Sequence, residues 1–259
     1  MTPDIDPVKY ILAIVALAIL TLLFFARKSD AKPPQHELDA LHAQTPNIVR
    51  IQVQAHNGPS FGSGTYLGNG LVLSCAHIFD DGGVPWVYFP KEKEIPGSPI
   101  KVDRKWDMSL IQLKRLPTTA KGIPLATTET PGQSVYPTGY PQGNPRFFYQ
   151  PAKIVSYGHP RGHNGASEWV NWNASVPKGY SGGPILDGNG NLIGNIWGNT
   201  SGSRVRLTRA FLRPWLTKLK TVTYTRREEV PPPPNQQIAT GRFDLFGKRI
   251  YGNNCPNGR

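Results

Sequence analysis

The chain has 259 residues, of which 38% are hydrophobic and 18% are charged, which is enough for one large or two small globular domains with a sizeable core. Its 27 glycines and 26 prolines favour a β-rich domain over a helical one, and its two cysteines exclude a disulfide framework. The net charge of +12 attracts anionic surfaces, but the sequence lacks zinc-finger spacing and RNA-binding aromatic motifs, so no specific nucleic acid partner is expected.

The first predicted element is an apolar run at residues 10–26, YILAIVALAILTLLFFA. A run of about 17 such residues can just span a bilayer at about 1.5 Å of rise per residue. The alternative, a cleaved signal peptide, requires small residues near its cleavage site, where this chain has Phe24 and Phe25. We therefore predict a short tail at 1–9, followed by a retained transmembrane anchor that contacts the lipid bilayer through residues 10–26.

The residues after the anchor are predicted to form a juxtamembrane linker at 27–47, with a short helix at 35–44 because Leu38 and Leu41 are three residues apart. From Ile48 the pattern changes to the alternation of a β-strand, and short strand-like runs separated by glycine-rich turns follow. The runs lie at 48–55, 60–67, 70–77, 84–90, 108–114, 133–141, 148–158, 168–175, 183–187 and 191–198. Many short strands of this kind indicate an all-β sandwich or barrel.

One helix is predicted after the strands, at residues 209–220, with Pro214 near its start because proline is tolerated only in the first turn. It closes a folded domain predicted at 48–220. The remaining residues, 221–259, are rich in proline and basic side chains and show no periodicity, so we predict a mostly disordered tail.

Three residues of this domain have the side chains of a hydrolytic site. Ser181 lies in GYSGGP, a glycine-rich turn that could hold a nucleophile. Of the six histidines, His77 is the best candidate for the base that a serine hydroxyl requires, because it ends the apolar run GLVLSCAH. Asp107 directly precedes a strand, where its carboxylate could orient the imidazole, although His77 and Asp107 could each be purely structural.

The order His77, Asp107, Ser181 is one of the known orders of a catalytic triad. Together with the segments SGTYLGNGLVLSCAH, WDMSLIQL, GYSGGP and NIWG, it resembles the trypsin/chymotrypsin-like serine peptidases, in the compact bacterial HtrA/Deg-like form without a PDZ domain. The resemblance covers about residues 48–217. It implies two six-stranded antiparallel β-barrels with the active site between them and a C-terminal helix.

The resemblance also implies a role for each site residue. Ser181 attacks the scissile carbonyl, His77 is the general base and then the general acid, and Asp107 orients His77. The backbone N–H groups of Gly179 and Ser181 form the oxyanion hole. The remaining implied positions form the substrate-binding pocket, at Ser175, Trp197 and Gly198.

Two departures from the family pattern affect specificity and activation. Ser175 places a neutral side chain at the base of the pocket, which disfavours Lys and Arg at P1 and favours small or medium apolar residues. Tyr180 replaces the aspartate that pairs with a newly cleaved N-terminus in digestive members, so activation by such cleavage is not expected.

Neither a cofactor nor a metal is expected, since the histidines lack paired ligand spacing. Cys75 is predicted to be a buried free thiol, and Cys255 lies in the tail, where it could crosslink two chains.

The sequence therefore predicts a membrane-anchored serine endopeptidase acting on polypeptides, with envelope protein quality control as its expected role. Two alternatives are a catalytically silent trypsin-fold binding module and a basic structural protein. The resemblance places the peptidase domain outside the cytoplasm, in the periplasm. Arg27, Lys28 and Lys32 oppose this orientation, because positive residues favour the cytoplasmic side of an anchor.

Overall fold

The structure, a computed structural model, describes residue 14 and residues 32–142, 144–158 and 168–216. All of them belong to the first of two units, Met1–Tyr224 and Thr225–Arg259. Of the predicted anchor only Ile14 is described, and it is helical. Among the described helices, none has the length and apolar character needed to cross a membrane. The predicted tail at 221–259 lies outside the described residues.

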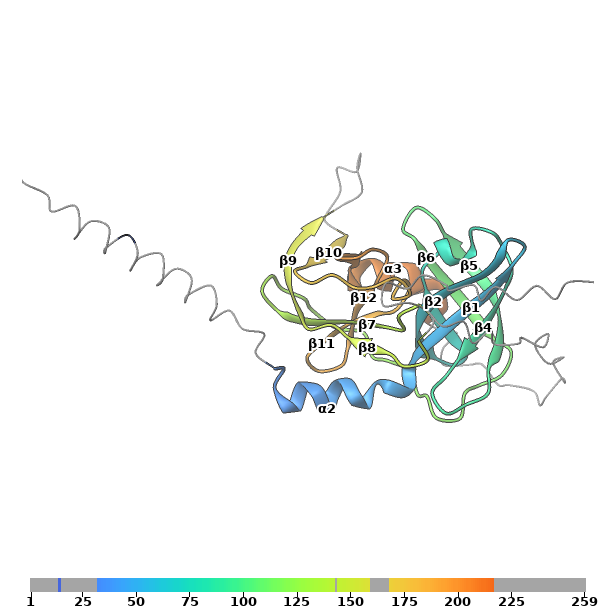
Figure 1. Cartoon of the computed structure of the whole chain (residues 1–259), viewed down its shortest axis with the longest axis horizontal. Helices are drawn as coiled ribbons and strands as arrows, with labels where there is room; N and C mark the ends of the chain where they lie inside the picture. The colour runs from blue at the N-terminus through green and yellow to red at the C-terminus, as the bar shows by residue number, and fades with distance from the viewer. Residues whose placement is uncertain (1–13, 15–31, 143, 159–167, 217–259) are drawn as a thin grey trace, which may run out of the picture. The chain divides into compact units, whose positions relative to one another are not determined.

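Six antiparallel strands close into a barrel and confirm the first predicted barrel (Figure 1). Their order is β1-β2-β3-β6-β5-β4. The bounds are β1 Ile48–Ala55, β2 Gly58–Gly68, β3 Leu71–Ser74, β4 Val84–Tyr88, β5 Ile95–Asp103 and β6 Met108–Leu113. The alternation of β1 places Val49, Ile51 and Val53 in the barrel core, while Ile48 faces a different cluster.

Strand β5 is absent from the sequence prediction because it contains Pro96 and Pro99, and proline cannot donate a ladder hydrogen bond. In the structure β5 pairs with both β4 and β6, and its register shifts between Pro99 and Lys101. Pro99 lies at this register shift, where a strand tolerates proline, whereas Pro96 is paired with Trp86 of β4.

The second half of the fold corrects the predicted second barrel. It is a seven-stranded sheet in the order β12-β11-β7-β9-β10-β13, with β8 paired to β7. The bounds are β7 Ser134–Gly139, β8 Phe148–Tyr149, β9 Ala152–Gly158, β10 Trp169–Trp172, β11 Pro184–Asp187, β12 Leu192–Asn195 and β13 Ser201–Ser203. The two ends of this sheet are joined by an isolated bridge between Ile196 and Gly202 and by a hydrogen bond from the Asn195 N–H to the Ser203 hydroxyl, and β12 and β13 form no continuous ladder.

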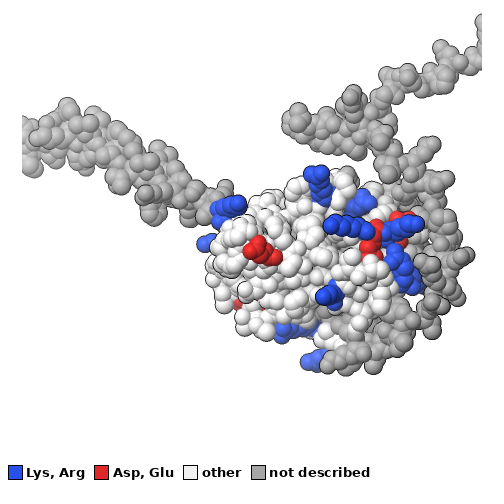
Figure 2. Space-filling model, turned by 90° about the horizontal axis from the view of Figure 1, so that it is seen from below, with Lys and Arg blue, Asp and Glu red and all other residues white. Residues whose placement is uncertain are grey.

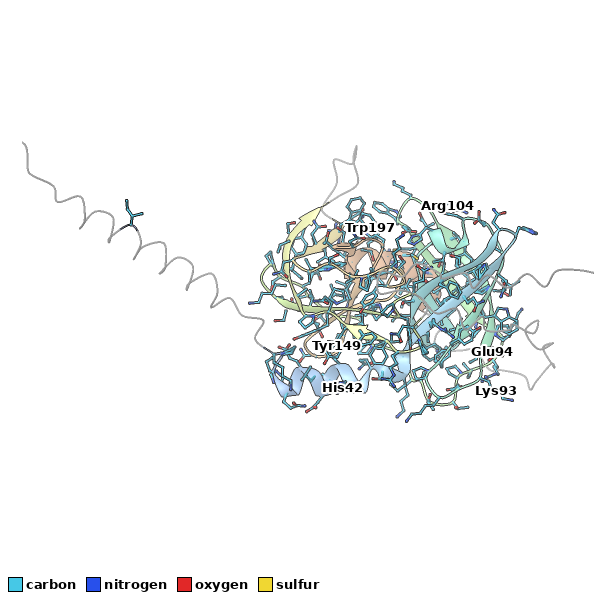
Figure 3. The ribbon with its side chains drawn as sticks, in the orientation of Figure 1. His42, Lys93, Glu94, Arg104, Tyr149 and Trp197 are labelled. Atoms are coloured by element: carbon cyan, nitrogen blue, oxygen red, sulfur yellow. The ribbon has the colours of Figure 1, made fainter. Side chains whose placement is uncertain are left out.

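Helix α2 (Gln35–Ala43) confirms the helix predicted at 35–44 and buries Leu38 and Leu41. Its His42 lies edge-on to Tyr149 of β8, with 6.2 Å between the ring centroids (Figure 3).

Helix α3 (Val205–Leu216) begins four residues earlier than the sequence predicted, and Pro214 lies near its end, not its start. The first turn forms because the Thr208 N–H donates to the Arg204 carbonyl at 3.0 Å while Val205 and Leu207 are buried. Burial of this apolar face outweighs the lower helix propensity of Val205 and Thr208.

Both sheets and both helices contribute to one hydrophobic cluster, which packs the two halves against each other. Its members include Leu41 of α2, Leu73 of β3, Leu192 of β12 and Phe211 of α3. The basic side chains do not form a single patch on the face shown in Figure 2. Lys and Arg occur there at several separate places.

Candidate active site

His77 lies beyond the strand on which the sequence placed it. Strand β3 ends at Ser74, and His77 opens a single 3₁₀ turn, η2 (His77–Phe79). The hydroxyl of Ser109 donates to the Cys75 carbonyl at 2.8 Å and fixes the chain between strand and turn. The side chain of His77 is 42% exposed, so its imidazole is accessible to a substrate while its backbone is anchored.

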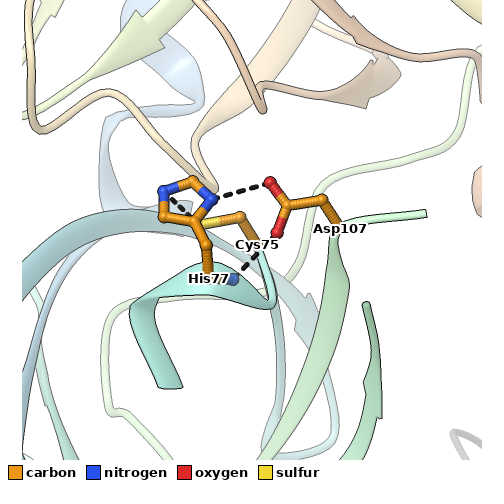
Figure 4. A group of neighbouring side chains, drawn as sticks. All are labelled: Cys75, His77 and Asp107. Atoms are coloured by element: carbon orange, nitrogen blue, oxygen red, sulfur yellow. Dashed lines mark hydrogen bonds and ion pairs between the residues drawn. The ribbon is translucent and has the colours of Figure 1, made fainter. Parts of the chain in front are cut away.

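Asp107 lies against His77, at the position where the sequence predicts an orienting carboxylate. Its Oδ1 accepts hydrogen bonds from the backbone N–H groups of Ala76 (2.9 Å) and His77 (2.8 Å), and its Oδ2 lies 2.7 Å from Nδ1 of His77 (Figure 4). Asp107 has a φ of 48°, which is uncommon for a residue other than glycine and often marks a functional site. A carboxylate at Nδ1 holds the ring hydrogen there and leaves the lone pair on Nε2.

The hydrogen bond to Asp107 is the main reason that the pKa of His77 is raised from its usual 6.5 to about 10. The contact with Cys75 raises this pKa further, and burial acts in the opposite direction. The carboxylate therefore stabilises the imidazolium that a general base becomes when it takes a proton.

The loop around Ser181 requires glycine on both sides of the serine. Gly179 has a φ of 98°, and a Cβ there would lie 2.4 Å from the Tyr140 carbonyl oxygen. Gly182 has a φ of 84°, and a Cβ there would lie 2.1 Å from the Ser74 hydroxyl oxygen. Neither contact leaves room for a side chain, so the GYSGGP sequence is needed for this backbone path.

Two peptide groups of this loop present free N–H donors. The Lys178 carbonyl accepts from the Gln142 N–H at 2.9 Å, and the Tyr180 carbonyl accepts from the Gly183 N–H at 2.8 Å. In a trans peptide the N–H points opposite to the carbonyl, so these bonds turn the N–H groups of Gly179 and Ser181 the other way. Within the described chain neither N–H has an acceptor, so both are available to a substrate oxygen.

Ser63 of β2, which the sequence analysis did not single out, joins the barrel to this loop. Its hydroxyl donates to the Gly179 carbonyl at 2.7 Å and accepts from the Tyr140 N–H at 2.8 Å. Its own N–H donates to the Ser181 carbonyl at 2.8 Å. Ser63 is fully buried, so it positions the loop without contacting a substrate.

We expect Ser63→Ala to lower kcat by about 10- to 100-fold with a small change in KM, because the Gly179 and Tyr140 backbone groups lose their partner and the loop shifts. Steady-state kinetics on a peptide substrate measure this. Ser203→Ala is the matched control, since Ser203 is equally buried and also bonds to backbone, at Asn195. Equal kinetic losses in both variants would contradict a specific role for Ser63.

Cys75 is a buried free thiol, as predicted, but its contact was not foreseen. Its Sγ lies 3.6 Å from Nε2 of His77.

Among the described residues no hydrogen bond joins His77 to the Ser181 hydroxyl. The two segments are nevertheless adjacent, because a Cβ on Gly182 would lie 2.8 Å from the Cys75 nitrogen. The structure therefore brings Ser181 beside the segment that holds the base.

The predicted pocket residues come from two neighbouring segments. Ser175 is exposed, Trp197 and Gly198 are half-buried, and the Val176 N–H donates to the Asn199 carbonyl at 2.9 Å, which joins the two segments. The Trp197 ring, labelled in Figure 3, lies 4.7 Å from the ring of Trp169 between centroids.

Tyr180 occupies the core of the second sheet, where it is 3% exposed. Burial raises the pKa of its hydroxyl to about 12, so the side chain is neutral at physiological pH. A neutral buried phenol cannot form an ion pair with a chain terminus.

A closed barrel joined to a second β-sheet, with an oriented histidine and a glycine-rich serine loop at the junction, defines a hydrolase of the serine-protease class. The trypsin-like peptidase domain family matches residues 62–194, just over half of the 259 residues. The chain belongs to this family and is a serine endopeptidase. No curated protein has a sequence that matches that of the chain.

Solved structures show the same fold. The active form of the Rv3671c protease from M. tuberculosis is 22% identical, with a TM-score of 0.60 over 76% of this chain and 91% of that one. The HtrA-type protease AlgW with a tripeptide is 18% identical, with a TM-score of 0.60 over 68% of this chain. A serine endoprotease from Yersinia pestis is 19% identical, with a TM-score of 0.59 over 69%. This chain spans 62% of the AlgW chain and 65% of the Yersinia one.

Proposed function

We propose that the chain hydrolyses peptide bonds through a His77–Asp107–Ser181 triad. Nε2 of His77 removes the proton from the Ser181 hydroxyl, and Oγ attacks the scissile carbonyl. The negative charge that forms on the carbonyl oxygen is stabilised by the N–H groups of Gly179 and Ser181, each worth about 3–4 kcal/mol. His77 then protonates the leaving amine, and water hydrolyses the acyl-enzyme by the reverse sequence.

The observation that supports this mechanism best is that the N–H groups of Gly179 and Ser181 have no acceptor among the described residues. An N–H that serves only the fold normally has an acceptor. These two are instead held outward by the bonds of the neighbouring carbonyls. They are preorganised for a charge that exists only during the reaction.

The proposed substrates are polypeptides with a small or medium apolar residue at P1. Ser175 contributes a neutral hydroxyl, and Trp197 and Gly198 contribute an apolar wall and an open entrance. The described chain has no carboxylate among these pocket residues, which disfavours Lys and Arg at P1.

The proposal includes a membrane anchor at residues 10–26 and a periplasmic peptidase domain acting in envelope protein quality control. The apolar run supports the anchor, and the likeness to HtrA-type folds supports the location. The charges at Arg27, Lys28 and Lys32 favour the opposite side, so orientation is part of the test.

The test is labelling of intact spheroplasts with a membrane-impermeant fluorophosphonate, followed by separation of membrane and soluble fractions. We expect a labelled band in the membrane fraction that is absent from Ser181→Ala. Labelling only after lysis would place the domain in the cytoplasm and contradict the proposed location. A labelled band in the soluble fraction would contradict the anchor.

One observation favours the alternative of a catalytically silent binding module: Nε2 of His77 is directed at Cys75 Sγ. In a silent module the imidazole would remain there. A folded wild-type protein that resists the probe even after lysis would support this alternative over the peptidase mechanism.

A further inference from the structure

The thiol of Cys75 is a buried nucleophile that the proposed mechanism does not use. It has no exposed surface and no disulfide partner. Its Sγ faces Nε2 of His77 at 3.6 Å, while Asp107 lies on the opposite side of the ring (Figure 4). Cys75, His77 and Asp107 place one donor atom each within 4.8 Å of one another.

The separation of the two donors fits a tetrahedral metal ion. Zinc binds thiolate sulfur at about 2.3 Å and imidazole nitrogen at about 2.0–2.1 Å. With Sγ and Nε2 3.6 Å apart, one ion at those distances makes an S–Zn–N angle of about 112°, close to the tetrahedral value. The ion would therefore fit the observed separation of Sγ and Nε2.

The surroundings of His77 suit metal binding as well. Asp107 at Nδ1 fixes the tautomer whose lone pair is on Nε2 and makes that nitrogen a stronger ligand. The imidazole is 42% exposed, so solvent or a substrate group can supply the remaining ligands. Mixed sulfur and nitrogen donors select Zn²⁺ over Mg²⁺ or Ca²⁺, which prefer oxygen.

We propose that Cys75 and His77 form an inhibitory Zn²⁺ site, with Asp107 orienting the histidine. Zinc forms bonds to Sγ and Nε2, and the thiol proton passes to solvent. No group is oxidised or reduced. The site is reversible, because a chelator removes the ion and the thiol regains its proton.

Zinc and Ser181 compete for the same lone pair on Nε2. A metal-bound imidazole cannot accept the serine proton, so bound zinc blocks nucleophilic attack. This inhibitory consequence rests on the proposed function, whereas the metal site itself does not.

The site is tested with Co²⁺, which gives a near-ultraviolet charge-transfer band when a thiolate binds it. Full-length Ser181→Ala is titrated with Co²⁺ and then with Zn²⁺. We expect one equivalent of Co²⁺ to produce the band and Zn²⁺ to abolish it. Asp107→Asn should weaken metal affinity by roughly 10- to 100-fold, and Cys75→Ala should remove the band.

Cys255→Ala is the matched control, since it removes the other cysteine and should keep the band. Cys75→Ser accompanies Cys75→Ala in case the smaller side chain impairs folding, with thermal unfolding recorded for both. Absence of the band in Ser181→Ala, or its persistence in a folded Cys75 variant, would overturn the metal site.

The inhibitory consequence is read with the fluorophosphonate probe on the wild type. We expect Zn²⁺ to block labelling, EDTA to restore it, and Cys75→Ala to label equally with and without zinc. Labelling that zinc leaves unchanged overturns the inhibition. A wild type that is never labelled contradicts the peptidase mechanism, while the Co²⁺ band still reports on the metal site.

Discussion

Ser181→Ala is expected to lower kcat by about a million-fold, because the attacking oxygen is removed and water must replace it. The loop itself should keep its shape, since the bonds of Gly179, Tyr180 and Gly182 are made by backbone atoms and by Ser63. Hydrolysis of a fluorogenic peptide measures the loss.

The variant should still exceed the uncatalysed rate by about a thousand-fold, because the N–H groups of the oxyanion hole remain in place. Ser156→Ala is the matched control: Ser156 is exposed on β9, and among the described residues its hydroxyl bonds only to the Asn171 side chain. A Ser181→Ala enzyme with wild-type kcat and an unchanged melting temperature would exclude the serine as the nucleophile.

The features that the sequence predicted well are those with a short-range signature. Strand β1 was predicted at 48–55 because alternation appears within eight residues, and Asp107 because it directly precedes such a strand. The Ser181 loop was found because three glycines in six residues have few other uses. Each of these assignments depends on neighbours in the sequence.

The features that the sequence did not show depend on contacts between distant residues. Ser63 bonds to Gly179, 116 residues away, and nothing near Ser63 in the sequence distinguishes it from other serines. The approach of Cys75 to His77 follows from the turn after β3, which the sequence had extended as a strand. The second barrel does not close because the two ends of the sheet pair only through an isolated bridge between distant residues, which alternation within a strand cannot show.

Asp107→Asn is the second change with a large expected effect, about a ten-thousand-fold loss of kcat at pH 7. The amide oxygen can keep accepting from the Ala76 and His77 backbone N–H groups, which turns its NH₂ group toward Nδ1 of His77. Nδ1 must then accept a hydrogen bond, so the ring hydrogen moves to Nε2. The lone pair that should take the serine proton is lost. Asp103→Asn is the matched control, because Asp103 caps the same loop through the Lys105 and Trp106 N–H groups.

The pH dependence separates this mechanism from simple unfolding. His77 must be neutral to act as a base, so activity falls as pH drops through its pKa, which the hydrogen bond to Asp107 raises above the usual 6.5. In Asp107→Asn the carboxylate is missing, so the pKa of His77 and the acidic limb of the pH–activity profile both move down toward the usual 6.5. The raised pKa also stabilises the wild-type fold fully below pH 6.5, and that stabilisation is lost as pH rises through about 10. The difference in unfolding free energy between wild type and Asp107→Asn should therefore shrink over that window. If the acidic limb of the pH–activity profile is at the same pH in a folded Asp107→Asn enzyme as in the wild type, the carboxylate does not set the basicity of the imidazole.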